Sequence, residues 1–583
     1  MHGWSGKVLH VDLSAASWRV EEPPREVLRA FIGGKGLAGW YLRERATLPF
    51  DDPNMPLLVF SGPLGGTVAP TSGRATLMSR SALTNAIGDC SVGGGLGTEL
   101  RRAGWDGLVI TGRAHVPCGI EIENGSVTLI EARVLAGLGA EEVFRRLAGK
   151  GSVACVGPAA ENGVLFSSVL VDRRHAAGRT GLGCGFAAKN LKYLMVHGTG
   201  RVRVHDPGLL KAAREEIMRL TAASPALLGP LGFAEFGTAA LVDLIDSRRM
   251  TPTDNFRATK FPGASRVNAY AFRERYRPKR HGCRGCHILC KKIAADGRSV
   301  PEFETVSHFS ALIGQADPEL VMRANALCND LGLDTISAAS TLACHRDVEG
   351  RDLSAPEVLS LIEDMGRGRG AGRALGRGAA RYAASRGRPE AAMTVKGLEL
   401  PAYDPRGAYG MALAYATSTR GGCHLRAYPV SHEILRKPVA TDRFSFEGKA
   451  RIVKIAEDMN AVVDSLPACK FTFFAASLEE YAKAYSAVTG EASSAQDLLL
   501  AGERISYHER MMNAANGFSA AEDDLPARFF AEAGTGGGGV EVPAVPRADF
   551  LAARSAYYRV RGLDENGLPR RETAERLGLT WIG

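Results

Sequence analysis

Residues 62–97, GPLGGTVAPTSGRATLMSRSALTNAIGDCSVGGGLG, give the strongest indication of the fold class. Short runs of apolar and β-branched residues alternate here with glycine, proline and serine, which is typical of strands separated by tight turns. The same pattern recurs on both sides, in KVLHVDL, PLLVFSG, GLVITGR and CGIEIENGSVTLIEA. We therefore predict a β-rich half that extends from the N-terminus to residue 203.

The pattern changes from residue 204 onward, where apolar residues recur at helical spacing. LLKAAREEIMRL and PELVMRANALCNDLGL are examples, and a period of 3.6 residues favours amphipathic helices. Two Gly-rich stretches, residues 366–378 and 534–539, are expected to form a loop and a linker. We find no internal repeat of fixed period, and the fold class is predicted to be α+β.

The composition is that of an ordinary globular protein of several domains, with 583 residues of which 45% are hydrophobic and 23% are charged. Its apolar runs are far shorter than the roughly 20 residues of a membrane span. The N-terminus lacks the basic start and apolar core of a signal peptide. We expect a cytoplasmic protein with no membrane span.

The net charge is +9, from 72 Lys and Arg against 63 Asp and Glu. A mildly basic surface is the simplest interpretation, and nucleic-acid binding is not expected. The densest basic stretch, from Arg273 to Arg284, has few aromatic residues and leads directly into a group of cysteines. It suits an acidic electron-transfer partner as well as it suits phosphate.

The cysteines point to ligand chemistry. The run Cys283-Arg-Gly-Cys286-His-Ile-Leu-Cys290 has the spacing C-x2-C-x3-C, which lets one turn present three thiolates to one inorganic centre. A structural zinc site competes, because C-x2-C is also typical of zinc ribbons, although no second C-x2-C is present. A fourth ligand is needed, and spacing does not choose among the downstream candidates Cys328, Cys344, Cys423 and Cys469.

Three glycine-dense strings form a second group of motifs: Ser72-Gly-Arg74, residues 90–97 (CSVGGGLG) and residues 176–183 (AAGRTGLG). Successive glycines let backbone N–H groups surround anionic oxygens, and the arginines add charge-assisted bonds. None fits the dinucleotide fingerprint, and each alone is compatible with a tight turn in a β domain. Together the three strings favour a phosphate-bearing cofactor.

Six segments occur in the order expected of the aldehyde:ferredoxin oxidoreductase family, which the chain resembles from Gly6 to its C-terminal LPRRETAERLGL. They are GPLGGTVAPTSGRATLMSRSALTNAIGDCSVGGGLG, AAGRTGLG with KNLK, the cysteine run followed by PEFET, CNDLGLDTIS, LPAYDPRGAYGMALAYATSTRGGCHLR, and DSLPACKF.

The resemblance implies a β-rich pterin-binding domain of two pseudo-symmetric sheets over residues 1–203, then two mainly helical domains over 204–400 and 401–583. It implies two pyranopterins that hold tungsten or molybdenum, a magnesium ion that bridges their phosphates, and one [4Fe-4S] cluster. It also selects Cys469 as the fourth cluster ligand, beside Cys283, Cys286 and Cys290. Cys90 and Cys184 are then expected to be small buried residues.

The resemblance further implies which residues contact the pterins and magnesium. They are Arg74, Ser91, Gly93, Gly94, His175, Ala176, Gly178, Arg179, Asn329, Asp334 and Asp464. Three positions depart from the family pattern. Ser91 replaces a common asparagine, His175 replaces a common arginine, and Pro467 removes a backbone N–H donor beside Cys469.

The catalytic candidates are Glu302 and Glu304 in PEFET and His424 in GGCHLR. A Glu-x-Glu spacing in a strand would place both carboxylates on one face, where repulsion and burial raise a pKa. A solvated strand edge is the plainer interpretation. The resemblance matches Glu304 and His424 to residues that line the metal pocket and leaves Glu302 less certain; His308 and His432 are expected to be structural.

The implied activity is oxidation of an aldehyde to a carboxylate, with electrons passing through the cluster to ferredoxin or a separate Fe–S subunit. A homodimer or a hetero-oligomer is compatible with the sequence. One alternative is a tungsten subunit like that of class II benzoyl-CoA reductases, which act on an acyl-CoA; a thiolate at Cys423 approaching the metal would favour it, while packing is the plainer reading of that cysteine. Another alternative is a non-catalytic Fe–S electron-transfer subunit.

Overall fold

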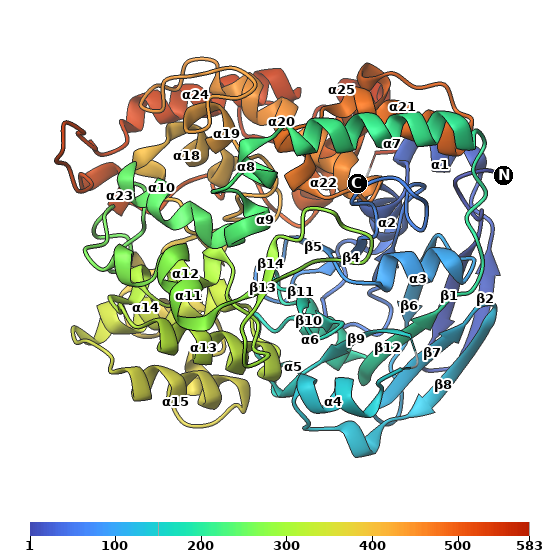
Figure 1. Ribbon diagram of the computed structural model, residues 1–583, viewed down its shortest axis with the longest axis horizontal. Helices are drawn as coiled ribbons and strands as arrows, with labels where there is room; N and C mark the ends of the chain where they lie inside the picture. The colour runs from blue at the N-terminus through green and yellow to red at the C-terminus, as the bar shows by residue number, and fades with distance from the viewer. Residues whose placement is uncertain (150, 582–583) are drawn as a thin grey trace.

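The N-terminal part of the chain forms two six-stranded β-sheets, seen at the lower right of Figure 1. The structure is a computed structural model that describes residues 1–149 and 151–581. The first sheet consists of β1 (Val8–Asp12), β2 (Ser17–Glu21), β3 (Leu57–Phe60), β4 (Ala75–Arg80), β5 (Ile87–Val92) and β6 (Gly107–Thr111). The second consists of β7 (Cys118–Glu123), β8 (Ser126–Glu131), β9 (Ser152–Val156), β10 (Val169–Val171), β11 (His175–Ala177) and β12 (Leu191–His197).

The two sheets share one topology. The first has the order β2-β1-β6-β3-β4-β5, and the second, read from its β8 edge, has the order β8-β7-β12-β9-β10-β11. Each strand of the second sheet, from β7 to β12, thus occupies the position that the strand numbered six lower has in the first sheet. The pairing directions agree as well, because β1–β6 and β7–β12 are parallel and the other neighbours are antiparallel. The expected pseudo-symmetric sheets are confirmed.

The sheets pack face to face, and one hydrophobic core fills the space between them. Leu57 and Val59 of β3 belong to this core, together with residues of β7, β9 and β12. Leu58 and Phe60 point to the other face of β3 and pack against helices. Burial on both faces explains why β3 is the continuous apolar run LLVF rather than an alternating one.

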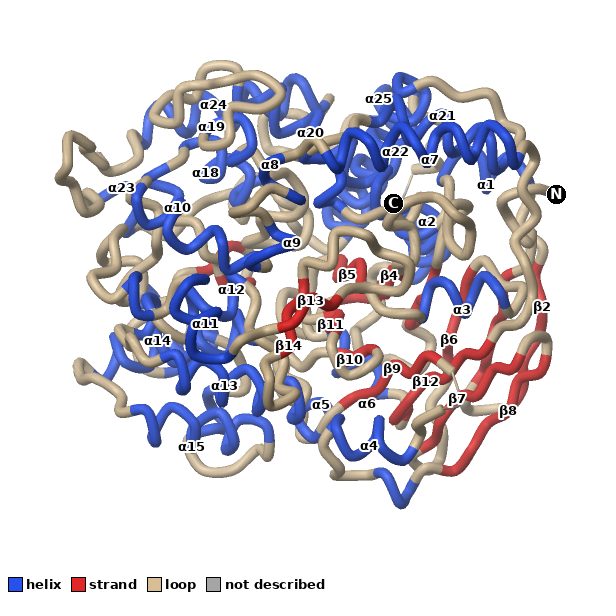
Figure 2. Tube along the Cα trace, viewed as in Figure 1, coloured by secondary structure: helices blue, strands red, loops and turns tan. Residues whose placement is uncertain are grey.

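The remainder of the chain is mainly helical, as Figure 2 shows. Six helices accompany the sheets: α1 (Arg25–Phe31), α2 (Gly34–Leu42), α3 (Leu96–Arg102), α4 (Ala140–Arg146), α5 (Pro158–Glu161) and α6 (Leu182–Ala188). The middle of the chain contains α7 (Pro207–Ala222), α8 (Pro225–Leu228), α9 (Phe233–Phe236), α10 (Leu241–Ser247), α11 (Ala269–Tyr276), α12 (Phe303–His308), α13 (Pro318–Leu331), α14 (Thr335–Glu349), α15 (Ala355–Gly366), α16 (Gly372–Leu375) and α17 (Ala379–Ser385). The C-terminal part contains α18 (Tyr409–Thr417), α19 (Val430–Glu433), α20 (Lys449–Ser465), α21 (Leu478–Thr489), α22 (Ala495–Ala515), α23 (Arg528–Ala531), α24 (Arg547–Arg561) and α25 (Arg571–Arg576).

Two short hairpins interrupt the helices: β13 (Lys279–His281) with β14 (Lys291–Ile293), and β15 (Thr394–Val395) with β16 (Leu398–Glu399). Local sequence signals set the helix ends. In α7 and α13 an aspartate caps the N-terminus and proline follows it at the first helical position. Gly332 ends α13 in the left-handed conformation, with φ 77°.

The helices bring distant parts of the chain together. Helix α7 lies beside α21, at the top of Figure 1, and shares a core with it. Helices α20 and α22 pack against α2, which in turn contacts β3 and β4 of the first sheet. The proposed limits of the three domains at residues 203 and 400 stay a prediction, since α7 packs with the C-terminal part.

The structure corrects one detail of the sequence interpretation. Residues 366–378 were expected to form a loop, but they include the short helix α16. Residues 534–539 lack regular helix or strand, as expected. Of the helices in the described residues, none is by itself long and apolar enough to cross a membrane; the segments Pro207–Ala222 and Pro225–Phe236, bent by 72°, reach the length and composition only as a pair.

Candidate active site and cluster site

The candidate site lies where the edges of both sheets meet the β13–β14 hairpin. Strands β5 and β11 are in contact, and Figure 1 shows β4, β5, β11, β13 and β14 close to one another at the centre of the molecule. Arg74 immediately precedes β4, and its guanidinium donates to Ser91 of β5, to Oγ at 2.9 Å and to the carbonyl oxygen at 2.6 Å. Ser91 therefore fixes Arg74 at the sheet edge.

The four cysteines expected to bind a cluster surround Arg74. Three of them lie in the loop between β13 and β14, and Cys469 precedes the short 3-10 helix Lys470–Phe474; all four are half-buried. Burial alone would lower the pKa of Arg74, but the thiols of Cys469, Cys283 and Cys290 raise it, because they lie close enough to act on its charge. Distant parts of the chain thus place four sulfurs around one arginine.

The four sulfurs do not converge on one point for a single metal ion. Within the described residues, no three His, Cys, Asp or Glu side chains are close enough together to hold a single metal ion. A [4Fe-4S] cluster binds one cysteine at each of four iron atoms, so its ligands need not converge on one point. The arrangement is compatible with a cluster and unlike the closed tetrahedral group of a structural zinc site.

The cysteine loop is anchored to the N-terminal part. Arg284, between the first two cysteines, forms an ion pair with Glu99 of α3, and the other Glu99 oxygen accepts from the N–H of Gly198 at 2.9 Å. His175 Nδ1 lies 3.9 Å from Cys283 Sγ. Burial and the charge of Lys291 lower the pKa of His175 to about 2, so this ring is neutral. His175 therefore adds no charge where arginine is common in the family.

Glu304 and His424 form a second group, brought together from α12 and from the loop that follows α18. His424 Nε2 lies 3.5 Å from Glu304 Oε1, and Glu304 Oε2 accepts from the N–H of Ala402 at 2.8 Å. Glu304 Oε1 and His424 Nδ1 are buried and have no hydrogen-bond partner among the described residues. Such atoms are costly unless another group satisfies them, so both are available to a bound group.

The charges of this pair differ from those of exposed groups. Burial raises the pKa of Glu304 to about 8, although the Ala402 N–H and Arg179 oppose the shift. Burial lowers the pKa of His424 well below its usual value, and Arg179 and Arg420 add to the effect. Near neutral pH, Glu304 is mostly protonated and His424 is neutral.

The expected strand geometry of Glu302 and Glu304 is wrong. Glu302 is the N-cap residue of α12 and Glu304 lies in its first turn, and residues two apart on a helix do not face each other. Glu302 instead binds Lys291 Nζ at 2.5 Å, and this cation holds the pKa of Glu302 below its usual range. Burial, not repulsion between the two carboxylates, therefore raises the pKa of Glu304.

Three further residues surround the pair and were not identified from the sequence as part of the site. His308 is fully buried, with Nδ1 2.7 Å from the Glu304 carbonyl oxygen and Nε2 3.2 Å from that of Leu400. Tyr403 and Tyr428 share a hydrogen bond of 2.8 Å between their hydroxyls, and both rings lie near the His424 ring, at 5.8 and 6.3 Å. His308 fixes the backbone of Glu304, and the two tyrosines form a wall beside His424. By contrast His432, likewise expected to be structural, contacts the Val439 carbonyl oxygen.

Buried cations hold the loop that carries His424. Arg179 Nη1 donates to the Gly422 carbonyl at 2.8 Å, Lys470 Nζ donates to the Leu425 carbonyl at 2.9 Å, and Arg426 forms an ion pair with Asp89 of β5. Residue 470 follows the predicted cluster ligand Cys469, so Lys470 joins the cluster segment directly to the loop of His424. Only the fold could indicate these contacts, because the partners are far apart in sequence.

Cys423 belongs to the same network. Its sulfur accepts from Arg420 Nε at 3.0 Å, from Arg420 Nη2 at 2.9 Å and from the Leu425 N–H at 3.2 Å. Burial alone would raise the pKa of this thiol, but Arg420 and Arg426 lower it to about 7. Cys423 is buried, as the packing interpretation expected, and its sulfur also accepts the hydrogen bonds that hold Arg420. Cys90 and Cys184 are buried, and burial raises the pKa of each thiol to about 11.

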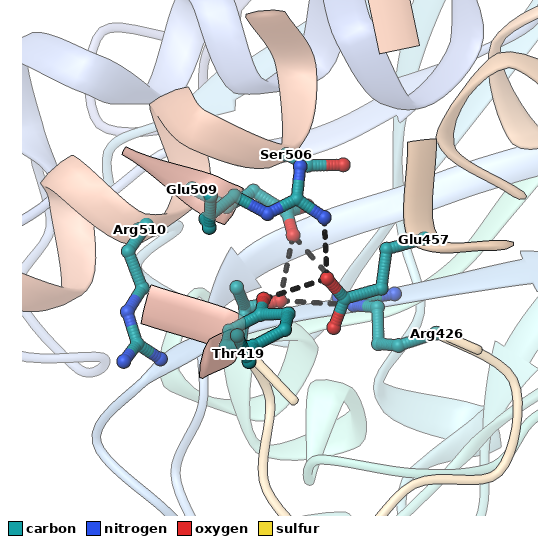
Figure 3. Close-up of a pocket in the computed structure, with 8 residues that line it drawn as sticks. Thr419, Arg426, Glu457, Ser506, Glu509 and Arg510 are labelled. Carbon is teal, nitrogen blue, oxygen red and sulfur yellow. Dashed lines mark hydrogen bonds and ion pairs between the residues drawn. The ribbon is translucent and has the colours of Figure 1, made fainter. Parts of the chain in front are cut away.

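A small cavity lies behind the loop (Figure 3). It is lined by polar and charged residues: Thr419, Arg426, Glu457, Ser506, Glu509, Arg510, Tyr557 and Arg561. The cavity offers about 10 Å³ to the centre of a water molecule, which is close to the minimum that holds one. It is too small for an organic substrate and instead belongs to the charged network that supports Arg426.

Other predicted cofactor contacts have hydrogen-bond partners within the protein. Arg179 donates to Asp334 Oδ2 at 3.3 Å, and Asp334 caps α14. Asp464 accepts from Lys470 at 2.7 Å through one oxygen, while Oδ1 is buried without a partner among the described residues. Asn329 donates to Asn325 at 3.3 Å.

Four predicted contacts lie on strands or turns at the sheet edges. Gly93 and Gly94 leave no room for a side chain, since a Cβ on Gly93 would lie 2.5 Å from Cys283 Sγ and one on Gly94 would lie 2.9 Å from Asp172. Gly178 is open apart from Asp334, and Ala176 is exposed on β11. The close approach of these side chains to the backbone, together with the φ of 98° at Gly94, explains the glycines there.

The backbone beside Cys469 is regular despite Pro467. The N–H of Ala468 donates to the Val463 carbonyl at 2.8 Å and the N–H of Leu64 donates to the Leu466 carbonyl at 3.1 Å, so the end of α20 is closed without an N–H at Pro467. A Cβ on Gly62 would lie 2.0 Å from the Ser465 carbonyl oxygen. This close approach explains why glycine follows β3, where the first sheet meets the segment that carries Cys469.

Comparison with known proteins gives one consistent answer. Residues 8–198 match the family profile described as the N-terminal domain of aldehyde ferredoxin oxidoreductase, and residues 212–579 match its domains 2 and 3. The chain is 35% identical to the tungsten-containing aldehyde ferredoxin oxidoreductases of Pyrococcus furiosus and Thermococcus kodakarensis, with 99% of each chain covered. A solved chain of the active-site complex BamBC of benzoyl coenzyme A reductase has the same fold, with a TM-score of 0.85 at 20% identity over 100% of this chain and 98% of that one. The chain belongs to the aldehyde ferredoxin oxidoreductase family of oxidoreductases.

Proposed function

We propose that the protein oxidises aldehydes to carboxylates, using tungsten or molybdenum bound by two pyranopterins and passing electrons through a [4Fe-4S] cluster to ferredoxin. The observation that carries the proposal is the pair Glu304 and His424, which lie 3.5 Å apart with one buried, unpaired atom each. The names of the full-length relatives support the substrate class and tungsten.

The residues present fit the proposed cofactors. Cys283, Cys286, Cys290 and Cys469 supply the four thiolates of a cluster, and Arg74 supplies a buried cation among them. Residues 90–97 and 176–183 supply backbone N–H groups for pterin phosphates and backbone carbonyls, such as that of Ala176, for magnesium. When bound, the metal and pterins would supply a two-electron acceptor for the oxidation, and the cluster would supply a one-electron route to the partner.

The reaction converts an aldehyde and one water into a carboxylic acid, two protons and two electrons, so the protein must bind a carbonyl and accept protons. His424 is neutral and can donate its ring N–H to the aldehyde oxygen. Glu304 in its carboxylate form can accept a proton from water, and a pKa of about 8 makes it an effective base near neutral pH. Tyr403 and Tyr428 form one wall of the space beside His424 and exclude water from that side.

Two isosteric variants test the proposal. Glu304→Gln and His424→Asn remove the proton-transfer groups, but neither residue is a proposed cluster ligand or part of a Gly-rich string, so iron and pterin content should stay at the wild-type level. Loss of one acid–base group removes about 10²–10⁴-fold of rate, and each variant should lose this much kcat for aldehyde oxidation with a viologen acceptor. Variants that change only KM would identify binding groups instead. Wild-type protein that contains metal and iron but oxidises no aldehyde would contradict the proposal.

The alternatives have less support. The benzoyl coenzyme A reductase chain shows the shared fold alone, and the sulfur of Cys423 is already bound by three donors. A non-catalytic Fe–S subunit would not need Glu304 and His424 with unpaired buried atoms. A cytoplasmic location stays a prediction.

A further inference from the structure

The β13–β14 hairpin and the end of α11 carry an unusual density of positive charge. Between residues 273 and 284 the chain has six Arg or Lys residues and one Glu. Three of the cations, Arg275, Arg277 and Lys279, are exposed, and no carboxylate among the described residues lies within ion-pair distance of them. We call these three residues the cationic rim.

The neighbouring cations differ from the rim because they already have partners. Arg280 forms an ion pair with Glu235, and Arg273 lies 3.5 Å from the same carboxylate. Arg284 is paired with Glu99. Arg273, Arg280 and Arg284 therefore hold α11 and the hairpin against the rest of the protein. The charges of the cationic rim instead face the solvent.

The rim is next to the place where electrons would leave the protein. Lys279 is in β13, four residues before the first cluster cysteine. Gly285, between Cys283 and Cys286, is exposed, and an added Cβ there would meet nothing within 4 Å. The cysteines are half-buried directly behind this tip, so a partner seated on the hairpin would face the proposed cluster across a single loop.

We propose that the cationic rim is the docking surface for a small acidic one-electron carrier protein of the ferredoxin type. The inference rests on the proposed function in one respect only, namely that the electrons come from the cluster proposed at the four cysteines. Unpaired surface charges gain little from their own protein but attract an oppositely charged partner, which raises the association rate and orients it. A stacked nucleic acid is less suitable, because Tyr276, the aromatic residue between Arg275 and Arg277, is buried.

Charge reversal tests the surface. The rim variant combines Arg275→Glu, Arg277→Glu and Lys279→Glu. The control variant combines Arg386→Glu, Arg451→Glu and Arg559→Glu, three exposed cations on or beside α17, α20 and α24 that also lack an ion-pair partner among the described residues. The two sets are matched in charge, and Arg275 and Arg386 each lie over a tyrosine ring, at 5.6 and 5.4 Å.

Two electron acceptors separate docking from chemistry. An acidic ferredoxin requires docking, whereas a net-neutral, zwitterionic viologen does not. At low ionic strength we expect the rim variant to lose about tenfold or more of kcat/KM for ferredoxin, a loss within the range of electrostatic steering, while its viologen rate stays at the wild-type level. The control variant should keep both rates. The difference between rim variant and wild type should shrink as salt is added.

Direct binding keeps the inference independent of turnover. Calorimetric titration of holoprotein with ferredoxin should show weaker binding for the rim variant than for the control variant, even for a protein that oxidises no aldehyde. Equal ferredoxin binding by the rim and control variants at low salt would overturn the docking surface. If the wild-type protein does not oxidise aldehydes with the viologen, the proposed function is wrong instead.

Discussion

Glu304 carries a proton at neutral pH because its carboxyl group is buried, and this sets the pH dependence of any reaction in which it acts as the base. Its pKa is raised from the usual value to about 8. The carboxylate form is present above that pH and is lost as pH falls through it. Base catalysis should therefore strengthen with rising pH in the window just below and around pH 8.

We expect kcat/KM for an aldehyde to rise with pH and to level off above about 8, measured with the zwitterionic viologen. Glu304→Gln should abolish this limb along with most of the rate. Cys423→Ser is the matched control, because the pKa of that thiol lies nearby, at about 7. A pH limb that survives in Glu304→Gln and disappears in Cys423→Ser would assign the titration to the thiol.

At the same scale, the sequence predicted some residues of the site but not their partners. Glu304 and His424 could be selected only through the family resemblance, since a Glu-x-Glu and a lone His are common. Tyr403 and Lys470 gave no signal, because their roles depend on contacts with residues far away in sequence, and His308 was expected only to be structural. Glu302 was grouped with Glu304 by spacing, but its partner is Lys291, which periodicity cannot reveal.

Among the elements, the strands were predicted well and the start of α12 was not. KVLHVDL, PLLVFSG, GLVITGR and CGIEIENGSVTLIEA all form strands, because alternation and continuous apolar runs reflect burial on one or both faces of a sheet. PEFET is too short for its period to distinguish strand from helix. Its N-cap position and first turn are set by packing of Phe303 and Val306 into the core of the middle region.

The contact between the Lys470–Phe474 helix and the loop of His424 gives a prediction at this scale. Lys470→Met removes the donor to the Leu425 carbonyl and to Asp464. An unsatisfied buried acceptor costs about 1–3 kcal/mol, so we expect kcat for aldehyde oxidation to fall about tenfold or more. Lys470→Arg keeps a cationic donor and should restore much of the rate.

Iron content separates the two possible roles of Lys470. The adjacent Cys469 is a proposed cluster ligand, so a variant that disturbs it would lose iron. Wild-type iron content with a reduced kcat in Lys470→Met supports positioning of His424 by the lysine. Loss of iron in step with activity would show that Lys470 serves the cluster segment instead.

The whole molecule is built from a duplicated sheet with helices packed around it, and the sequence alone did not reveal the duplication. The strand orders of the two sheets coincide strand for strand, yet no period is visible along the chain. The topology depends on which faces of the strands are buried, and many different apolar residues can fill a buried position. The two sheets can therefore share a topology without sharing a sequence. The pseudo-symmetry was therefore predicted only through the family resemblance. The change from β-rich to helical at about residue 204 could instead be predicted directly from the periodicity of the apolar residues.

This architecture brings Cys469 to the cysteine loop across more than 170 residues of chain, because the first sheet holds Arg74 and both segments lie close to it. The metal content of the whole chain follows from that convergence. We expect about four irons per chain from a cluster with four cysteine ligands, one tungsten or molybdenum, and no zinc, in protein purified without oxygen. Cys469→Ser should lower the iron content, whereas Cys184→Ser, which changes a buried thiol next to Ser167, should leave iron unchanged. Elemental analysis of the three proteins decides the matter: stoichiometric zinc without iron, or equal iron in both variants, would show that the four cysteines do not form one cluster site.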